Sequence, residues 1–329
     1  MTAAGQVLVI SDYEDVHADA VIDALNVAGV PVFRLNTSDF GSDGRITFAV
    51  ASGGAAEACS FVANPLRTLP LESVRSVWYR RPVPVASNPR IAENARPYAR
   101  EQFTLALRYL EGVVRRKWVN HPDANRRANN KIVQLEAARR AGLSIPDTLL
   151  TNDPEQLDAF RRRHAGEQLI VKDLDLSVAG AKILGRGVAT QLLPADHAPS
   201  VESVTSAPFI VQPFVPKEFE LRCTLIGTEV FAARIDTPDA VDWRNAYAPD
   251  GRRFRDLNRY SAFALPPGVR RALLELAAEF ELRFAAIDLI VTPSGECVFL
   301  ELNPNGQWLW LQRDAGLPLI EAMARELAA

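Results

Sequence analysis

The chain of 329 residues has few of the residues from which metal and thiol centres are usually built. Its three cysteines, Cys59, Cys223 and Cys297, lie far apart and form no C-x-x-C pair, and its four histidines are equally scattered. This pattern indicates neither a zinc site nor a disulfide framework, and it is typical of thiols packed as small hydrophobic groups in a reducing compartment. The motifs G-x-S-x-G, H-E-x-x-H and G-x-x-x-x-G-K-[ST] are also absent, so the chemistries that depend on them are not indicated.

Long apolar runs and a strong charge of one sign are missing as well. No apolar stretch approaches the roughly 20 residues that a membrane-spanning helix needs, and the opening MTAAGQVLVISD carries neither a basic region nor a cleavage site. With 48% hydrophobic residues, 23% charged residues and a formal net charge of −3, the composition is that of an ordinary globular protein and argues against binding held by nucleic-acid phosphates. We therefore expect a cytoplasmic protein with no membrane and no nucleic-acid partner.

Strand and helix patterns alternate over the first third of the chain. QVLVIS, PVFRLN, ITFAVAS and VRSVWYRRP are typical of strands, a helical pattern lies between the first two, and a helix of about residues 93–116 follows the last. Such alternation favours a parallel, Rossmann-like sheet. Because no G-x-G-x-x-G follows the first strand, we expect no dinucleotide site there.

Two further lobes follow the break at Trp118-Val119-Asn120-His121-Pro122. The strand QLIVK belongs to the second lobe, and FIVQPFV, FELRCTLIG, EVFAARID and a late hairpin belong to the third; the charge-rich residues 249–259 are expected to form a loop. The helices predicted for these lobes span about residues 126–141, 154–164, 268–282 and 318–327.

The late hairpin, AAIDLIVTPSGECVFLELN, consists of two apolar runs around a Pro-Ser-Gly turn signal. If the turn is centred between Ser294 and Gly295, Asp288 lies directly across from Glu301. Asn303 faces the same way, because residues two apart in a strand share a face. Opposed carboxylates destabilise a strand pair, and Mg²⁺, which accepts carboxylate and amide oxygens, removes the conflict. The alternative is an exposed face with two unrelated acids, but the apolar flanks and the register favour the magnesium site.

Lys172 ends an otherwise apolar strand, where a lysine either extends to solvent or meets a phosphate as a point charge. The stretch SVAGAKILGRG follows it and contains Gly180, Gly185 and Gly187. Glycines allow backbone N–H groups to approach phosphates closely. This loop favours the phosphate contact.

A second alternation, FIVQPFVPKEFELRC, places Glu220 and Arg222 on one face and the apolar residues beside them on the other. In isolation it is best interpreted as an exposed Glu–Arg pair of little energetic weight. The functional interpretation turns the charged face toward a nucleotide. Arg234, in the next strand, would then enter the same cleft, and two arginines would suit the clamping of a transferring phosphoryl group.

These parts occur in a recognisable order. An Asn-Asn-Lys that opens a helix, a strand lysine, a Gln-Pro-Phe strand, a Glu-x-Arg and a final Asp…Glu-x-Asn together resemble the ATP-grasp superfamily. The phrases VWYRRP, AARRAGLSIPDTLLTND, VQPFVPKEFELR and LELNPNGQWLWLQ are similar to the ATP-grasp maturases of ribosomally made peptides, the microviridin or graspetide synthetases. The resemblance spans nearly the full chain.

The resemblance implies an α/β ATP-grasp fold of three parts. Residues 1–120 would form a Rossmann-like pre-ATP-grasp domain, residues 121–207 a small central α+β lobe that covers ATP and binds peptide, and residues 208–329 the C-terminal lobe with the Mg²⁺ and ATP site. The backbone of the Gln-Pro-Phe-Val stretch would hold adenine between two lobes. The implied nucleotide contacts are Lys131, Lys172, Gln212, Phe214, Val215 and Glu220, the implied magnesium ligands Asp288, Glu301 and Asn303, and the implied catalytic residues Arg222 and Arg234.

The implied reaction converts an Asp or Glu side chain of a precursor peptide into an acyl phosphate at the expense of ATP. A Ser or Thr hydroxyl, or a Lys amine, then displaces phosphate and leaves an ester or an amide. The implied partners are a precursor peptide with a leader and an acidic, Ser/Thr-rich core, and a second copy of the chain in a homodimer. Two alternatives stay open: an ATP-grasp ligase that joins small amino acids or modifies a protein C-terminus, and an ATP-grasp module that binds peptide without catalysis.

Overall fold

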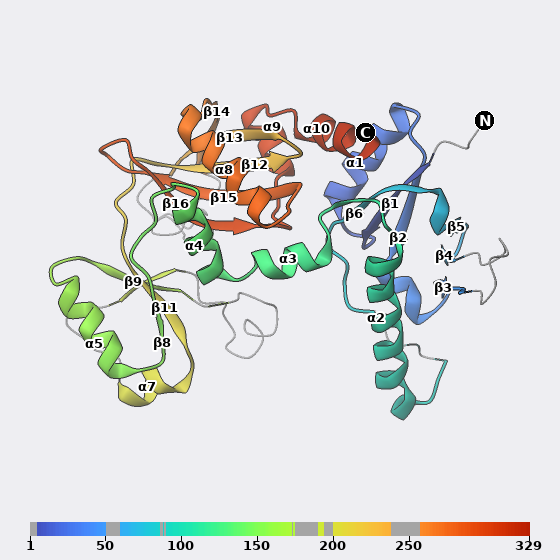
Figure 1. Ribbon diagram of the computed structural model, residues 1–329, viewed down its shortest axis with the longest axis horizontal. Helices are drawn as coiled ribbons and strands as arrows, with labels where there is room; N and C mark the ends of the chain where they lie inside the picture. The colour runs from blue at the N-terminus through green and yellow to red at the C-terminus, as the bar shows by residue number, and fades with distance from the viewer. Residues whose placement is uncertain are drawn as a thin grey trace.

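The protein is described by a computed structural model, which Figure 1 shows as three parts: an N-terminal part in blue at one end, a central part in green and yellow at the other, and a C-terminal part in orange and red. All of SVAGAKILGRG and most of residues 249–259 lie outside the described residues. None of the described helices has the length and apolar character that a bilayer crossing would require. The structure describes residues 5–50, 60–85, 88, 90–172, 174, 190–193, 200–237 and 257–329.

The N-terminal part contains the predicted parallel sheet, with strand order β2-β1-β6-β7. Its apolar strands are buried on both faces, as expected where helices cover a parallel sheet. The fourth strand, β7, forms where only a break was predicted, and the predicted strand ITFAVAS contributes just its first residues to a separate antiparallel sheet of β3, β4 and β5. The bounds are β1 Gln6–Ser11, α1 Val16–Val27, β2 Val32–Asn36, β3 Arg45–Thr47, β4 Phe61–Ala63, β5 Thr68–Pro70, β6 Val74–Tyr79, α2 Arg96–Val113 and β7 Lys117–Val119.

The single helix predicted over residues 126–141 is two helices, α3 (Pro122–Ala128) and α4 (Lys131–Arg140). Asn130 separates them because it is the N-cap of α4: its side chain accepts a hydrogen bond of 3.2 Å from the Val133 N–H. The buried alanines of both helices belong to the core of the C-terminal sheet. The two helices therefore pack with the C-terminal part rather than with the central lobe, where the expected boundary put them.

The central part is a four-stranded sheet of order β10-β9-β11-β8 with its own small core. β11 pairs with both β8 and β9, so the expected boundary after residue 207 divides this strand from its sheet. The central unit consequently extends through Pro213. Its elements are β8 Leu149–Thr151, α5 Pro154–Arg163, β9 Leu169–Lys172, β10 Gln191–Leu193, α7 Val201–Ser206 and β11 Phe209–Pro213.

The C-terminal part is built on a five-stranded antiparallel sheet of order β14-β13-β12-β15-β16. One face is covered by α4 and α8, and the far end of the other face packs against α9, α10 and α1 of the N-terminal part (Figure 1). β14 and α9 were not predicted. Trp308 is fully buried in the core that α9, α10 and α1 form with this face. The bounds are β12 Phe219–Ile226, β13 Glu229–Asp236, β14 Arg259–Phe263, α8 Pro267–Glu279, β15 Phe284–Val291, β16 Cys297–Asn303, α9 Leu309–Ala315 and α10 Leu319–Ala328.

Candidate active site

The predicted pairing of Asp288 with Glu301 is confirmed, although the strands pair in a different register nearer the turn. Nearer the turn, Leu289 pairs with Phe299, so the turn is centred half a residue before the predicted point. One extra residue, Leu300, is inserted into β16 between these two pairs. A bulge of this kind changes which side chains face one another across a strand pair. Without it, Leu300 rather than Glu301 would lie opposite Asp288.

Arg222 of β12 lies beside the carboxylate pair. It is the cross-strand neighbour of Asp288 on the other side of β15, and its Nη1 donates to the Asp288 Oδ1 at 2.6 Å. Both side chains are nearly buried, with 9% and 5% exposure, so solvent screens this ion pair little. Asn303 lies two residues beyond Glu301 at the end of β16 and is exposed. An arginine, two carboxylates and an amide therefore share one face of the sheet.

The donor set on this face fits a magnesium ion. Carboxylate oxygens on paired strands and an amide oxygen on the same face are hard donors of the kind that Mg²⁺ binds. Nowhere in the described ranges do three histidine, cysteine, aspartate or glutamate side chains gather into a group that could hold a metal, so this site depends on two carboxylates and an amide. With two carboxylates and one amide, the protein would supply only part of an octahedral shell, which suits Mg²⁺ shared with substrate phosphates and water.

The turn after β16 lies directly on this face. The Asn303 Oδ1 accepts a hydrogen bond of 2.9 Å from the Asn305 N–H, an Asx turn. The Arg222 Nη2 donates to the Gln307 carbonyl at 3.1 Å. Gly306 approaches the sheet so closely that a Cβ there would overlap the Cβ of Ala286 and lie 3.0 Å from the Arg222 Nη2. Glycine is required here by close approach, and this explains the Asn-Pro-Asn-Gly sequence that ends the strand.

Gln134 of α4 is a residue that sequence analysis did not identify. Its side chain, 3% exposed, donates from Nε2 to the Leu302 carbonyl at 2.7 Å and accepts at Oε1 from the Leu302 N–H at 2.9 Å. β16 is the edge strand of its sheet, and this side chain pairs with the outer edge between Glu301 and Asn303. A glutamine one turn after Lys131, at an otherwise apolar buried position, is the signal that could have revealed it.

The residues predicted to bind ATP phosphates come from two different parts. Lys131 is the first residue of α4, and Lys172 is the last residue of β9 in the central sheet. Lys172 pairs with Ile210, two residues before Gln212, so Lys172 and Gln212 share a face of that sheet. The predicted glycine-rich loop lies outside the described residues.

The predicted adenine-binding stretch begins at the end of β11. Gln212 is buried and donates from Nε2 to the Thr148 hydroxyl at 2.8 Å. The Phe214 N–H donates to the Gln168 carbonyl at 2.7 Å. A backbone donor for a base in this stretch is therefore left to Val215 or a residue after it.

Glu220 and Arg222 share a face of β12, and the apolar residues between and beside them pack into the core under α4 and α8. The predicted division of this strand into a charged and an apolar face is therefore correct. Glu220 is 8% exposed and forms an ion pair with Lys217. It is not part of an exposed ladder.

Arg234 does not lie where the sequence analysis put it. It pairs with Leu221, whose side chain points to the helix-covered face, whereas Arg222 points to the other. The Arg234 guanidinium lies 3.9 Å from the centre of the Phe219 ring and forms an ion pair of 2.6 Å with Asp236. The expectation that the two arginines enter one cleft is wrong, because one residue of register reverses the face.

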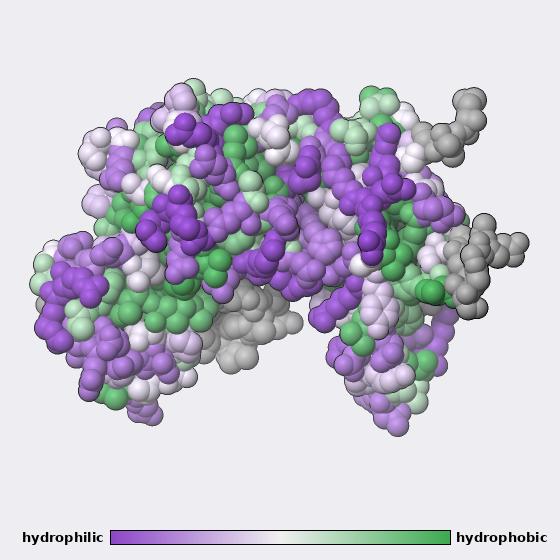
Figure 2. Space-filling model, viewed as in Figure 1, coloured by the Kyte–Doolittle hydropathy of each residue, from purple (hydrophilic) through white to green (hydrophobic). Residues whose placement is uncertain are grey.

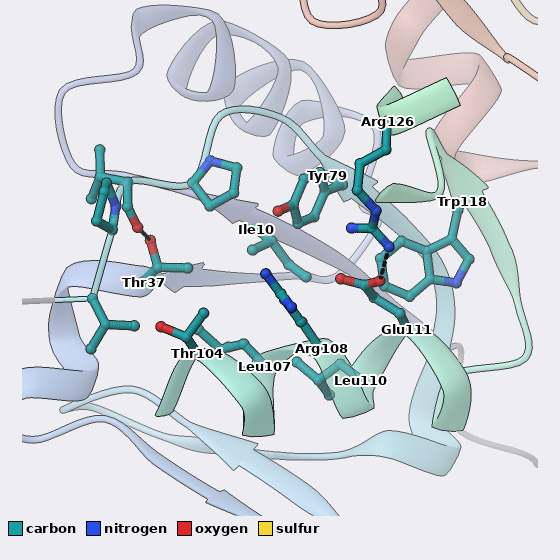
Figure 3. A pocket seen from close by; sticks show the side chains of 14 residues that line it. Ile10, Thr37, Tyr79, Thr104, Leu107, Arg108, Leu110, Glu111, Trp118 and Arg126 are labelled. Atoms are coloured by element: carbon teal, nitrogen blue, oxygen red, sulfur yellow. Dashed lines mark hydrogen bonds and ion pairs between the residues drawn. The ribbon is translucent and has the colours of Figure 1, made fainter. Parts of the chain in front are cut away.

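A separate cavity of about 270 Å³ lies in the N-terminal part (Figure 3). Ile10 and Tyr79 line it at the carboxyl ends of β1 and β6, the edge at which parallel sheets commonly bind ligands. Arg108 of α2 and the Glu111–Arg126 ion pair, 3.1 Å long, supply its charged groups. Among the described residues, none that lines it comes from the C-terminal sheet, so this cavity is distinct from the carboxylate face.

Known proteins are similar to this chain over its N-terminal part, over about two thirds of its length, or over nearly all of it. Residues 6–126 match the family model of the MvdD pre-ATP-grasp domain. The ribosomal protein bS6–L-glutamate ligase of Salmonella paratyphi B is 24% identical over 222 residues, which cover 67% of this chain and 70% of that protein.

Three solved structures match over 98% of this chain. The macrocyclase MdnC bound with precursor peptide MdnA, from Microcystis aeruginosa MRC, is 28% identical, with 99% of its chain covered and a TM-score of 0.81. MdnB, a macrocyclase of the same organism, is 26% identical, with 99% covered and a TM-score of 0.77. A Chryseobacterium gregarium RiPP-associated ATP-grasp ligase, in complex with ADP and a leader and core peptide, is 24% identical, with 96% covered and a TM-score of 0.86. The chain is an ATP-dependent ligase of the ATP-grasp superfamily, and its N-terminal part is a pre-ATP-grasp domain.

Proposed function

We propose that the chain is a peptide macrocyclase that phosphorylates Asp or Glu side chains of a ribosomal precursor peptide and joins them to Ser or Thr hydroxyls or to Lys amines. The observation that carries this proposal is the carboxylate pair of Asp288 and Glu301 with Arg222 in contact. It lies in a chain that is similar over 98% of its length to a macrocyclase with a bound precursor peptide.

Asp288, Glu301 and Asn303 would hold Mg²⁺, which when bound neutralises charge on the ATP phosphates and orients them. Arg222 is fixed beside them by its bonds to Asp288 and to the Gln307 carbonyl. Its cationic group is thereby preorganised to stabilise the charge that develops during phosphoryl transfer, without rearrangement at that moment.

The nucleotide would lie between the central sheet and the C-terminal sheet. Lys131 and Lys172, from α4 and β9, would meet the phosphates as point charges from the two sides. The backbone from Gln212 to Val215 would hold adenine, and Glu220 would face the nucleotide from β12. In this arrangement residues 1–120 form the pre-ATP-grasp domain, and the central unit ends after Pro213.

The chemistry needs no covalent enzyme intermediate. A peptide carboxylate attacks the γ-phosphorus of ATP, which gives an acyl phosphate and ADP. A hydroxyl or amine of the same peptide then attacks the acyl carbon, loses its proton and expels inorganic phosphate. The net change is loss of one water from the peptide for each crosslink and conversion of one ATP into ADP and phosphate. The residues above contribute positioning and charge, which are the main requirements of phosphoryl transfer.

We also propose a homodimer located in the cytoplasm. Four apolar side chains lie on one side of α2, and the helix projects from the body of the molecule (Figure 1). The visible surface of this region carries both hydrophobic and hydrophilic residues (Figure 2). Such a stripe suits a partner helix. The thiols of Cys223 and Cys297 are free, which suits a reducing compartment. The apolar side chains and their exposure are Tyr98 67%, Leu105 36%, Tyr109 60% and Val113 46%.

A second candidate function is the joining of a free amino acid to a protein. It is favoured by the similarity to bS6–L-glutamate ligase, whose matched region covers 67% of this chain against 98% for the macrocyclases.

Trapping with hydroxylamine tests the proposal. The protein is incubated with Mg-ATP, hydroxylamine and an acidic, Thr-rich peptide encoded beside its gene. Hydroxamates should form on Asp or Glu side chains of the peptide, and without the trap the peptide should lose one water per crosslink, with ADP formed in step. Hydroxamate on a free amino acid, or on a terminal carboxyl group, would support the second candidate instead. Absence of ADP with every acidic peptide would favour a module that binds peptide without catalysis.

A further inference from the structure

The turn that follows β16 is held by buried polar side chains from the N-terminal part. Arg80, directly after β6, is 1% exposed, and its Nη1 donates to the Asn305 carbonyl at 2.8 Å. The Arg80 main chain is fixed in turn, because its N–H donates to the Ile10 carbonyl at 2.9 Å. This contact joins residues 225 positions apart in the sequence.

Asp15 orients the Arg80 side chain. The Asp15 Oδ2 lies 3.5 Å from the Arg80 Nε and accepts a hydrogen bond of 2.9 Å from the Ser11 hydroxyl. Burial lowers the pKa of Arg80 to about 10, which leaves the guanidinium charged at neutral pH. The hydrogen bond from His17 and the charge of Arg80 hold the pKa of Asp15 below its usual value, against the effect of burial. The contact with the turn is therefore made by a charged donor in a fixed position.

His17 holds the next part of the turn. Its Nε2 accepts hydrogen bonds of 3.1 Å from the N–H groups of both Trp308 and Leu309, at the start of α9. The ring also packs edge-on against the Trp308 ring, with centroids 5.2 Å apart. A neutral imidazole thus satisfies donors that the first turn of a helix leaves without partners.

Asn120, after β7, completes the set. It is 1% exposed, and its Nδ2 donates to the Pro304 carbonyl at 3.1 Å and to the Phe284 carbonyl at 2.8 Å. From Pro304 to Leu309 the backbone is therefore held by three buried side chains of the N-terminal part and by Arg222 of the sheet.

Packing alone does not account for Arg80. Its Nε and Nη2 find no hydrogen-bond partner in the described part of the chain, and a buried charge with open donors is costly. For stability alone, hydrophobic side chains of similar volume in place of the buried Arg80–Asp15 pair would serve as well or better. What a charged, rigid donor adds is the placement of one carbonyl, two residues after Asn303.

We propose that Arg80, acting with Asp15 and His17, is a positioning residue for the turn of residues 304–309, which follows the magnesium ligand Asn303. The pre-ATP-grasp domain is then part of the catalytic apparatus. The proposal rests on the assignment of Asp288, Glu301 and Asn303 to Mg²⁺. A displacement of Asn305 would move the Asn303 side chain, because the Asn303 Oδ1 accepts a hydrogen bond from the Asn305 N–H in the Asx turn. Misplacement of reacting groups by about 1 Å costs on the order of 10²-fold in rate.

The test compares Arg80→Met with Arg81→Met, an equal change at the adjacent, exposed arginine, and with Arg80→Lys. Three quantities are measured: turnover against Mg²⁺ concentration, Mn²⁺ binding with ADP followed by electron paramagnetic resonance, and amide hydrogen exchange. Arg80→Met should raise the Mg²⁺ midpoint and the Mn²⁺ dissociation constant at least about fivefold, lower kcat roughly 10- to 100-fold, and speed exchange at residues 303–309 but not in β12. Arg80→Lys should recover part of each effect, and Arg81→Met should match the wild type.

Wild-type Mn²⁺ binding and exchange in Arg80→Met would overturn the proposal, and so would faster exchange throughout the sheet, which would indicate general destabilisation. The macrocyclase function is tested independently of this role. If wild-type protein does not turn over acidic peptides, that function is wrong, and Mn²⁺ binding and amide exchange still decide the role of Arg80.

Discussion

Replacement of Gly306 by alanine tests the site most directly. An added methyl group would overlap the Cβ of Ala286 by more than about 1 Å relative to an ordinary carbon–carbon contact of roughly 3.5–4.0 Å. Ala286 is fully buried in β15 and cannot retreat, so the turn must move away from the sheet. We expect Gly306→Ala to reduce ATP turnover by about 10²-fold, since the Asx turn carries Asn303 along, and to lower the free energy of unfolding by ~1–3 kcal/mol from overpacking.

The chain offers a matched control and a rescue. Gly268, in the first turn of α8, has nothing within 4 Å of a Cβ, so Gly268→Ala should leave turnover unchanged and stabilise the helix by about 0.5–1 kcal/mol. In the double variant Gly306→Ala with Ala286→Gly, the opposed methyl group is gone and most of the lost turnover should return.

Steady-state ADP release and urea unfolding measure these effects. Unchanged turnover in Gly306→Ala would refute the close approach. Loss of turnover that Ala286→Gly does not repair would show that the overlap with Ala286 is not its cause.

Three further predictions concern single side chains. Glu301→Gln should fold but lose turnover by orders of magnitude. Glu275→Gln, the same change on the exposed face of α8, should retain turnover, and equal activities of the two variants would contradict the metal site. Lys172→Ala should weaken ATP binding in calorimetry and leave peptide binding nearly unchanged, and equal ATP affinity would return Lys172 to a solvent-directed role. Burial lowers the pKa of His17 below its usual 6.5. On acidification, the unfolded chain therefore takes up a proton at a higher pH than the folded chain does, and the free energy of unfolding must rise with pH. This contribution is complete above pH 6.5 and is lost as the pH falls through the lower folded pKa; urea midpoints at pH 5.5 and 7.5 should therefore converge in His17→Gln, and an unaltered pH dependence would contradict the argument.

The parts of the site that could be predicted from the sequence are those that depend on local patterns, such as strand alternation and turn residues. The alternation of the β15–β16 hairpin placed Glu301 and Asn303 on one face, and Asp288 lies opposite Glu301 because the bulge at Leu300 compensates for the shifted turn. The same reasoning failed for Arg234 because its face depends on the turn before it. Gly227, with φ at +60°, belongs to a two-residue turn in which Ile226 pairs with Glu229, and this register turns even-numbered residues of β13 to the helix-covered face.

The contacts that hold the turn after β16 could not be predicted in this way. Gln134 and Leu302 are 168 positions apart, and His17 and Trp308 are 291 apart. A local sequence pattern cannot tell two kinds of buried histidine apart. One accepts hydrogen bonds from a helix that is distant in the sequence, and the other is only packed. Only the tertiary fold, which brings the end of β6 and the start of α1 to the C-terminal sheet, reveals their partners.

The packing of α10 against α1 and β6 (Figure 1) has a consequence for biosynthesis. The core beside β1 includes Val9 and Val21 from one end of the sequence and Met323 and Leu327 from the other. On the ribosome, β1 to β7 emerge long before α10, and at roughly 5–20 residues per second the interval is on the order of ten seconds or more. During that interval the face of the first sheet that carries Val7 and Val9 packs against α1 but still lacks α10. The nascent pre-ATP-grasp domain is therefore expected to need a chaperone, or to remain loosely packed, until the last helix has been made.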